Sequence, residues 1–527
     1  MTRWLFVTTL ALGSVFRLGG LAWGLPLTLH ADEWVVVNGA IDMSARNSFE
    51  PGYFFRPDHL EMQLSYLAYQ AYSHLLHGMS PEVWFAQDQA SFYLISRLIT
   101  AVFGIAMIVL AYLIGKRFAR PVGLLSAMAV AFFPPFIENS HFATPDVPLA
   151  CACMLVVLAS MRYLESATWR DLLLACLGVS LAVTIKYPGA LAAVVIAVVV
   201  IIGVVRDRAW LRFFSHGAGA IGAVFAFLFL LSPVLFTNLA AVREQVTGQN
   251  STGHLGADGL DWSGNMAFYA RDFAVSAGAL LVLCVALGIF WAVRLRLVQA
   301  VPLMLGLVMW VGLSRLELHW DRWGLPMYVT PLLVAPIGLY YTVVWVRENR
   351  PDSRWPTAVL AVAAAVIGVN LLAGSAATTA SFLATDTRTA SLGYTHEHSI
   401  TADNSIYEGY TPLSPGAAKV FFDAFAVIDG RLRLSAMSTP SDAKFVVTST
   451  GMSARFMAEP KYVEQQRIYE LLDEQFPTVQ TWDPTPRGDG SAIEAVNTAR
   501  SLSYLLSLAG GGLVGPSIEI HSVPPDR

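Results

Sequence analysis

Long apolar runs recur along this chain from Trp4 to about Ala380. A helix needs about 20 apolar residues to cross the ~30 Å hydrocarbon core of a bilayer. Of the 527 residues, 55% are hydrophobic and only 14% are charged. The sequence therefore predicts a polytopic, all-α membrane protein.

We expect about 11 transmembrane helices. The first apolar stretch, Trp4 to Pro26, is long and lacks a clear small-residue cleavage site, so we interpret it as a retained helix and not as a signal peptide. Ten further spans are expected at approximately 90–115, 121–137, 147–164, 171–185, 189–205, 218–236, 274–293, 298–313, 326–346 and 357–380.

Basic residues are unevenly divided between the connections. Short connections on one side hold many of them, including Arg117, Arg206 and Arg294, whereas the longer connections on the other side hold few. The positive-inside rule then places the N-terminus in the cytosol. An odd number of crossings leaves the C-terminal part outside, and we expect a multi-pass protein of the cell membrane.

The composition changes near Ser381, where apolar spans end. Strand-like stretches at Ser405–Glu408, Lys444–Ser449 and Ser517–Ser522 alternate with helical segments such as Pro460–Gln475. We therefore predict a transmembrane domain over residues 1–380 and a small soluble extracytoplasmic α/β domain over 381–527. Within the first domain, residues 27–89 form a first extracytoplasmic loop with interfacial helices.

Charge and cysteine content exclude some classes of protein. The net charge is -4 and no block of Lys or Arg occurs, so nucleic acid is not an expected partner. The four cysteines, Cys151, Cys153, Cys176 and Cys284, all fall inside apolar runs. They are best interpreted as buried small hydrophobic residues and not as a disulfide framework.

Polar residues gather in four connections on the predicted outer side. These connections contain Asp32, Glu33, Arg56, Asp58, His59 and Glu61; Glu138, His141 and Asp146; Lys186 and Tyr187; and Arg315, Glu317, His319, Asp321 and Arg322. Acids and bases at one membrane face suit an enzyme that works on a lipid-linked substrate. Cations such as Lys186 and Arg322 can neutralise a phosphate at the interface, and a carboxylate can take the proton from an acceptor hydroxyl.

Several segments resemble the GT-C glycosyltransferases, in particular the branch that includes protein O-mannosyltransferases and the lipid A aminoarabinose transferase. They are the Asp32-Glu33 pair, Arg56–His59, His141–Asp146 and Thr184–Pro188. In the tail, the similar segments are Asp386–Thr389, Ser405–Pro412, Lys444–Arg455 and Gly515–Ile520. The resemblance implies a GT-C transmembrane domain followed by an extracytoplasmic domain.

The same resemblance implies roles for individual residues. Asp32 matches the catalytic carboxylate of the family, with Glu33 as second choice, and Asp146 matches a second acid. Lys186 and Arg322 stand where the family places cations near the lipid phosphate, although Arg322 lies in a His-Trp-Asp-Arg-Trp context and not in a plainer Arg-Tyr pattern. The other expected substrate-binding residues are Arg56, His59, His141, Tyr187 and His319.

The implied reaction moves a sugar from a polyprenyl-phosphate donor to an acceptor hydroxyl of a lipid, a glycan or a protein. Asp32 would deprotonate the acceptor, which attacks the anomeric carbon with inversion. Besides donor and acceptor, the expected partners are membrane lipids. No cofactor is indicated by a dedicated motif, and assistance by a divalent cation stays open.

Each residue also has a structural alternative. Asp32 and Glu33 could be a solvated loop pair or could cap the helix that follows, and Asp146 could cap its own helix. His141 could be a hydrogen-bonded structural histidine. Lys186 could extend its ammonium group to the interface, and Arg315 competes with Arg322 for the same role.

Two other classes of protein share the many spans. A secondary transporter would place ionisable groups near the bilayer midplane, whereas here they gather at the predicted outer ends. A non-catalytic scaffold that presents the C-terminal domain would tolerate Asp32→Asn.

Overall fold

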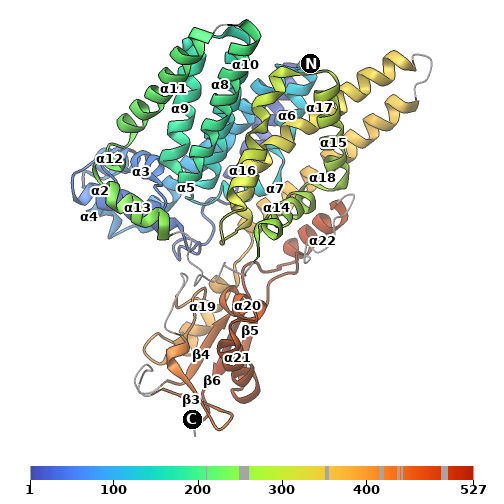
Figure 1. The fold of residues 1–527 in the computed structure, drawn as a ribbon. Helices are drawn as coiled ribbons and strands as arrows, with labels where there is room; N and C mark the ends of the chain where they lie inside the picture. Colours follow the sequence, from blue (N-terminus) through green and yellow to red (C-terminus); the bar gives the residue numbers. More distant parts are fainter. Residues whose placement is uncertain are drawn as a thin grey trace.

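The computed structural model describes residues 2–208, 210–248, 260–350, 355–414, 421–435, 440, 443–487 and 497–525. Figure 1 shows a helical bundle with a small sheet at one end. The N-terminus lies at the end of the bundle that is remote from the sheet, and the C-terminus lies beyond the sheet. A functional site between bundle and sheet would therefore draw on both parts of the chain.

Six helical segments of the described residues are long and apolar enough to cross a membrane. They are α5 (Gln89–Gly115), α8 (Asp146–Ser166), η2–α10 (Tyr187–Ala192 and Ala193–Asp207), part of α11 (Trp210–Leu231), η4–α17 (Asp321–Gly324 and Leu325–Asn349) and α18 (Trp355–Leu383). A bent pair, α14 (Trp262–Ala277) and α15 (Ala279–Arg294), makes an angle of 114° and gives up to seven spans.

Helices also occupy the remaining positions predicted as spans, but they are shorter. These are α1 (Thr2–Leu18), α6 (Arg120–Ala131), α9 (Trp169–Ile185) and η3–α16 (Val298–Met304 and Leu305–Leu313). The predicted span over 121–137 is interrupted after α6, and its second part is the separate helix α7 (Pro134–Asn139). Proline at the start of α7 supplies no backbone N–H to continue α6.

The first helix is shorter than predicted. The apolar stretch runs to Pro26, but α1 ends at Leu18 and residues 19–26 form turns. Gly20 has φ +89°, and a Cβ there would lie 2.6 Å from the Cβ of Phe382. Only glycine tolerates both this backbone conformation and this close approach to α18.

Arg17 is fully buried and donates to the backbone carbonyls of Gly13, Val130 and Ala131.

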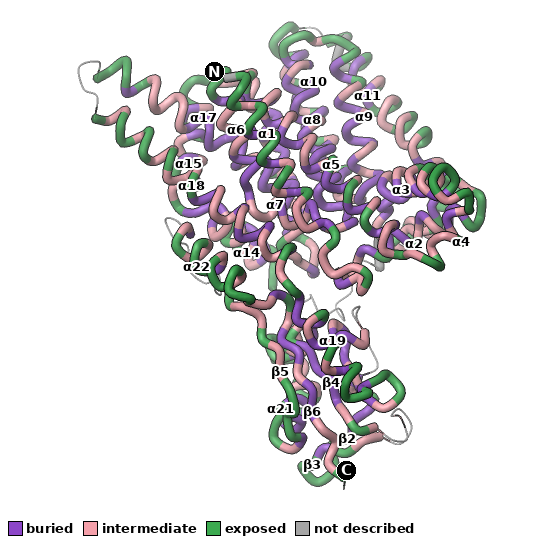
Figure 2. Tube along the Cα trace, turned by 180° about the vertical axis from the view of Figure 1, so that it is seen from behind, coloured by how far each residue is buried: buried purple, intermediate pink, exposed green. Residues whose placement is uncertain are grey.

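α8 lies at the centre of the bundle, because 89% of its most apolar 18-residue stretch is buried. It packs against α5, α9, α10 and α17, and Figure 2 shows buried chain through this region. All four cysteines are buried and free. By contrast, only 11% of the most apolar 18-residue stretch of α18 is buried, so α18 lies at the margin of the bundle.

A helical layer follows α1 at the end of the bundle nearest the sheet. It consists of α2 (Glu33–Ala45), α3 (His59–Tyr72), the π-helix η1 (Ser73–His77) and α4 (Pro81–Phe85). Leu75 and Leu76 of this layer are highly exposed. Two short helices, α12 (Val234–Thr237) and α13 (Leu239–Gly248), lie beside this layer (Figure 1).

Beyond α18 the chain forms a four-stranded sheet in the order β1-β4-β6-β5. The strands are β1 (Ser405–Tyr407), β4 (Phe445–Ser449), β5 (Thr478–Trp482) and β6 (Ile518–Ser522). β1 is parallel to β4, whereas β6 is antiparallel to both β4 and β5. The predicted strands correspond to β1, β4 and β6, while β5 was not predicted. This arrangement confirms the expected fold class of a helical membrane protein with a C-terminal α/β part.

The other elements of this part surround the sheet. They are α19 (Thr387–Glu397), η5 (Phe422–Ala424), the antiparallel pair β2 (Phe425–Ile428) and β3 (Arg431–Leu434), α20 (Thr450–Ala458), α21 (Val463–Gln475) and α22 (Thr498–Ala509). α22 packs on α18 of the bundle. The backbone N–H of Asn497 donates to the side-chain oxygen of Asn370, and Arg487 donates to the hydroxyl of Thr378 at 2.7 Å.

Glu408 is a buried acid that joins three parts of the sheet region. Its carboxylate accepts from the backbone N–H of Ser449 at 2.8 Å and from the hydroxyl of Tyr469. Burial raises the pKa of Glu408 to about 7, although both hydrogen bonds lower it. The unfolded chain therefore loses this proton near pH 4.5 while the folded chain keeps it to about pH 7.

We expect this acid to make stability depend on pH. The free energy of unfolding should fall by roughly 3 kcal/mol as the pH rises from about 4 to 8. Glu408→Gln, which cannot ionise, should weaken this dependence, while the exposed Glu464→Gln should keep it. Thermal unfolding of the detergent-solubilised protein at several pH values measures the difference. Equal pH profiles for wild type and Glu408→Gln would contradict the assignment.

Candidate active site

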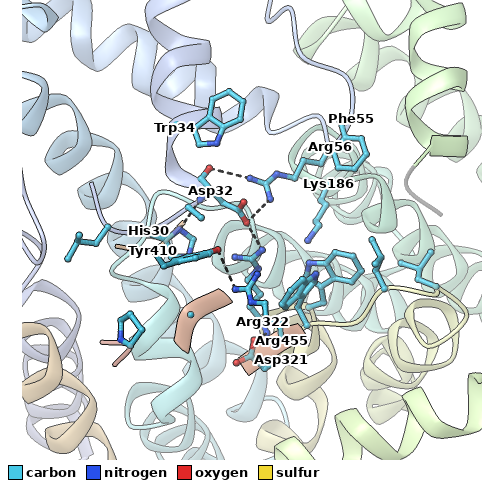
Figure 3. A pocket seen from close by; sticks show the side chains of 18 of the residues that line it. His30, Asp32, Trp34, Phe55, Arg56, Lys186, Asp321, Arg322, Tyr410 and Arg455 are labelled. Atoms are coloured by element: carbon cyan, nitrogen blue, oxygen red, sulfur yellow. Dashed lines mark hydrogen bonds and ion pairs between the residues drawn. The ribbon is translucent and has the colours of Figure 1, made fainter. Parts of the chain in front are cut away.

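A cavity of about 830 Å³ lies where the bundle meets the sheet region. Its lining comes from four stretches of the bundle and four of the sheet region, all distant from one another in sequence (Figure 3). They supply Trp23, Leu29, His30, Ala31, Asp32 and Trp34; Phe55 and Arg56; Lys186 and Pro188; Leu313, Leu316, Leu318, Trp320, Asp321, Arg322 and Trp323; and Arg388, Tyr410, Gly451, Arg455 and Pro516. Four residues predicted for the site, Asp32, Arg56, Lys186 and Arg322, share this cavity.

Asp32 lies immediately before α2 and makes no capping hydrogen bond to that helix. Its Oδ2 instead accepts from Nη1 of Arg56 at 3.3 Å and from Nη2 of Arg322. Within the described residues, no hydrogen bond reaches Oδ1. Burial by itself raises the pKa of Asp32, but the charges of Arg322 and Arg56 outweigh it and hold that pKa below the usual range. Asp32 is therefore ionised, with one carboxylate oxygen available.

Lys186 and Asp146 form a second ion pair beside Asp32. Lys186 follows the last residue of α9 and Asp146 begins α8, and Nζ lies 2.8 Å from Oδ1. Nζ of Lys186 also lies 4.7 Å from the centre of the Trp323 ring. The Nε of Arg322 is 3.8 Å from Oδ2 of Asp146. Asp146 thus stands behind the cavity wall and holds the two cations that line it.

Gly189 allows Lys186 this position. The 3-10 helix η2 turns the chain back immediately after α9, and a Cβ at Gly189 would lie 2.3 Å from the carbonyl oxygen of Ala182. Only a residue without a side chain fits such a close approach.

Arg56 connects Asp32 with a further buried acid, Asp58. Its Nε donates to Oδ2 of Asp58 at 2.8 Å. Burial raises the pKa of Asp58 to about 6, despite the opposing charge of Arg56. Arg56 therefore contacts two different carboxylates. Asp32 lines the cavity and is ionised, whereas burial disfavours the anionic form of Asp58.

Glu33, predicted as the alternative catalytic acid, lies outside the cavity. Its side chain is fully buried and accepts two hydrogen bonds from Arg97 of α5, each 2.7 Å long. It also accepts from the backbone N–H of Ala143 at 2.9 Å, while Arg97 donates to the carbonyls of Leu21 and Trp23. These contacts give Glu33 a structural setting, because both of its carboxylate oxygens already accept hydrogen bonds from buried donors.

Two of the three predicted histidines, His59 and His141, are also held away from the cavity. Both ring nitrogens of His59 are engaged, by the hydroxyl of Ser232 and the carbonyl of Tyr53, each at 2.7 Å. His141 contacts two backbone carbonyls at 2.8 Å and stacks on Phe382. Both are buried, which agrees with the structural alternative stated above for His141.

Tyr187 and His319 flank the cavity without lining it. The hydroxyl of Tyr187 donates to the carbonyl of Phe54 at 2.7 Å, next to the lining residue Phe55. His319 packs on Phe268 with ring centres 4.4 Å apart. Their contacts place both residues in the wall that supports the cavity.

Several lining residues were not predicted. Trp320 and Trp323 flank Arg322 in the sequence, and their indole rings lie near the cations of the cavity. Tyr410 and Arg455 belong to two of the four tail segments that resemble the family, but no role was assigned to them. The signal available in the sequence was that each lies in a segment that resembles the family.

One group of three side chains with metal-binding geometry occurs among the described residues. Asp473, Glu519 and His521 have potential ligand atoms within 4.8 Å of one another. They belong to α21 and β6 of the sheet region and do not line the cavity.

Residues 89–236 match the model of the dolichyl-phosphate-mannose-protein mannosyltransferase family. No curated protein sequence matches the chain. The matched segment contains α5 to α11, and with them Asp146 and Lys186. This finding confirms the predicted resemblance to GT-C glycosyltransferases of the O-mannosyltransferase branch.

Solved structures that match this chain include ArnT from Cupriavidus metallidurans. In the undecaprenyl phosphate complex the identity is 17%, with 73% of this chain and 71% of that chain covered and a TM-score of 0.43. For the apo state the identity is 16%, with 72% of this chain and 70% of that chain covered and a TM-score of 0.46. The S. cerevisiae Pmt1-Pmt2 complex bound to the sugar donor shows 18% identity, 46% and 34% coverage and a TM-score of 0.34.

Proposed function

We propose that this chain, a GT-C-type membrane glycosyltransferase by its family match, moves a sugar from a polyprenyl-phosphate-linked donor to an acceptor hydroxyl on a lipid, a glycan or a protein. The observation that carries the proposal is the cavity in which ionised Asp32 meets Arg56, Arg322 and Lys186 at the end of the membrane bundle. A donor whose lipid tail stays in the bilayer presents its phosphate at the end of the bundle, where this cavity lies.

Asp32 is the proposed general base. Its free Oδ1 can accept the proton of the acceptor hydroxyl while the oxygen attacks the anomeric carbon and the bond to the lipid phosphate breaks. A carboxylate held by two arginines is a weak base, because both charges favour its ionised form. The donor phosphate competes for the same guanidinium groups, so donor binding draws Arg322 toward the phosphate and makes Asp32 more basic.

Lys186 and Arg322 are the proposed partners of the departing phosphate. Both are nearly buried, with side chains 9% and 20% exposed. Charge-assisted hydrogen bonds are stronger where water is excluded, and they stabilise negative charge that develops on the leaving oxygen. Asp146 fixes both cations from behind. We assign Asp146 a positioning role and not proton transfer.

Lys186→Gln should raise the KM for the lipid-linked donor by about 10- to 100-fold, because one charge-assisted contact to the phosphate is lost. The change also leaves buried Asp146 unpaired, which destabilises the fold. The double variant Lys186→Gln, Asp146→Asn restores a neutral hydrogen-bonded pair and should recover the melting temperature without recovering the KM. If the double variant recovered the KM as well, Lys186 would serve the fold alone.

The function itself is tested by incubating the purified protein with a panel of polyprenyl-phosphate sugars. We expect one class of donor to be converted to the free polyprenyl phosphate, and conversion to accelerate in a membrane extract that contains the acceptor. Consumption of no donor in the presence of the extract would contradict the proposal.

The orientation and domain division belong to the same proposal. The charge distribution of the connections supports a cytosolic N-terminus, with the cavity and the sheet region on the extracytoplasmic side. The sheet beyond α18 supports separate domains over residues 1–380 and 381–527, with the first loop over 27–89. A tag inserted after Gly430, in the turn between β2 and β3, should react with an impermeant reagent on intact cells. Reaction only after lysis would overturn the orientation.

A further inference from the structure

All four tail segments contribute residues to the lining of the cavity. Two of them carry Tyr410 and Arg455, which the mechanism above does not use. Tyr410 follows β1, and Arg455 lies in α20. Both line the cavity together with Gly451 of the same helix. Figure 3 shows Tyr410 and Arg455 beside Arg322, with a hydrogen bond between Tyr410 and Arg455.

The backbone at this point is built for close contact. Tyr410 has φ +62°, a left-handed conformation that residues with side chains rarely adopt. A Cβ at Gly451 would lie 2.9 Å from the Cβ of Tyr410, so only glycine lets the ring approach α20 this closely. Strained backbone of this kind persists where the surrounding structure holds it, and it is concentrated at binding sites.

Glu408 holds the two segments together. It lies two residues before Tyr410, and it accepts from the backbone N–H of Ser449, which is the N-cap of α20. The hydroxyl of Ser449 in turn accepts from the backbone N–H of Gly451 at 3.2 Å. The Tyr410 turn and the first turn of α20 therefore form one unit, and Arg455 follows one turn later.

Arg455 is half-buried, yet it takes part in none of the ion pairs among the described residues. Nη2 donates to the hydroxyl of Tyr410 at 3.3 Å. The guanidinium lies 5.0 Å from the ring centre of Tyr410 and 5.4 Å from that of Trp320. The same Trp320 ring has Arg322 at 5.9 Å.

Two guanidinium groups thus share one indole, and their charges are balanced differently. Arg322 is paired with Asp32 and lies near Asp146, whereas the contacts of the Arg455 guanidinium among the described residues are with the rings of Tyr410 and Trp320 and the hydroxyl of Tyr410. A planar guanidinium that is oriented by aromatic rings and lacks a carboxylate keeps donors for a bidentate phosphate or carboxylate ligand.

We propose that Arg455 and Tyr410 form an acceptor subsite that binds an anionic group, a phosphate or a carboxylate, on the molecule that receives the sugar. This inference rests on the proposed transferase function. The donor phosphate is tied to a lipid tail, and the cations assigned to it adjoin the membrane helices α9 and α17. Arg455 comes from the sheet region, on the wall of the cavity that a water-exposed acceptor meets first.

The test uses the full-length protein in detergent with decaprenyl phosphate bound. Methyl glucuronide and methyl glucoside 6-phosphate serve as anionic probes, and methyl glucoside serves as the neutral probe. We expect only the anionic probes to raise the melting temperature of the wild type. Arg455→Gln should weaken their binding by about 10- to 100-fold. Arg455→Lys should restore part of it, and Arg431→Gln, on exposed β3, should bind as the wild type does.

Three outcomes would overturn the subsite. The anionic probes could fail to bind the wild type, they could bind the Arg455→Gln variant equally well, or that variant could lose affinity for decaprenyl phosphate to the same degree. The last result would assign Arg455 to the donor phosphate. Binding of decaprenyl phosphate to the wild type is measured first, so a failure of the proposed function is recognised separately from a failure of the subsite.

Discussion

Asp32→Asn is expected to lower the rate of sugar transfer by about 10²- to 10⁴-fold, which is the usual contribution of a positioned general base. Asparagine keeps the size of the side chain but cannot accept the proton. The measurement is the rate at which a polyprenyl-phosphate sugar is converted to polyprenyl phosphate by equal amounts of folded protein. Asp42→Asn, an exposed change on the same helix α2, is the matched control.

The pH dependence adds a second readout for the same residue. The arginines hold the pKa of Asp32 below its usual range in the protein without donor. Asp32 therefore stays ionised as the pH falls, and the acid limb of kcat/KM should lie below about pH 4. Once the donor phosphate draws Arg322 away, the pKa of Asp32 rises, so the acid limb of kcat should lie at higher pH. If the acid limbs of kcat and kcat/KM fell at the same pH, the proposed move of Arg322 from Asp32 to the donor phosphate would be wrong. An Asp32→Asn variant with wild-type rates would eliminate Asp32 as the base.

Glu33→Gln is expected to destabilise the protein by about 3–5 kcal/mol, because the change leaves the charge of Arg97 buried without its counterion. Both side chains of this pair are fully buried and joined by two hydrogen bonds. The expected result is a large fall in melting temperature and in the yield of folded protein. The double variant Glu33→Met, Arg97→Met, which removes both charges, should recover much of the loss.

This comparison also separates the two neighbouring acids. If Glu33→Gln folded with normal stability yet transferred no sugar, Glu33 and not Asp32 would carry the chemistry. If the double methionine variant folded and retained transfer, the role of Glu33 would be structural.

The fold class was predictable because it depends on composition and run length, which are local properties. Most predicted spans coincide with helices, since an apolar run in a bilayer must satisfy its own backbone hydrogen bonds. Their ends were less predictable. The turn after α1 depends on the approach of Phe382 to Gly20, and this contact joins residues that are far apart in the chain.

The candidate site was predictable only in part, for a similar reason. Asp32 and Glu33 are adjacent acids, so sequence alone could not decide between them. The structure separates them because Glu33 meets Arg97 of α5 whereas Asp32 meets Arg322, which comes from much later in the chain. Arg455 could not be assigned from sequence, because its place beside Trp320 depends on how the sheet region sits on the bundle.

The packing of α22 on α18 has a consequence for how substrates enter. The sheet region is attached to the bundle where Arg388 donates to the carbonyl of Leu29, and again where Asn497 contacts Asn370. Arg487, which donates to the hydroxyl of Thr378, is a third attachment. Several attachments at separate points restrict rotation of the sheet region as a rigid body. We therefore expect the position of Arg455 relative to Asp32 to limit the size of the acceptors that the cavity admits.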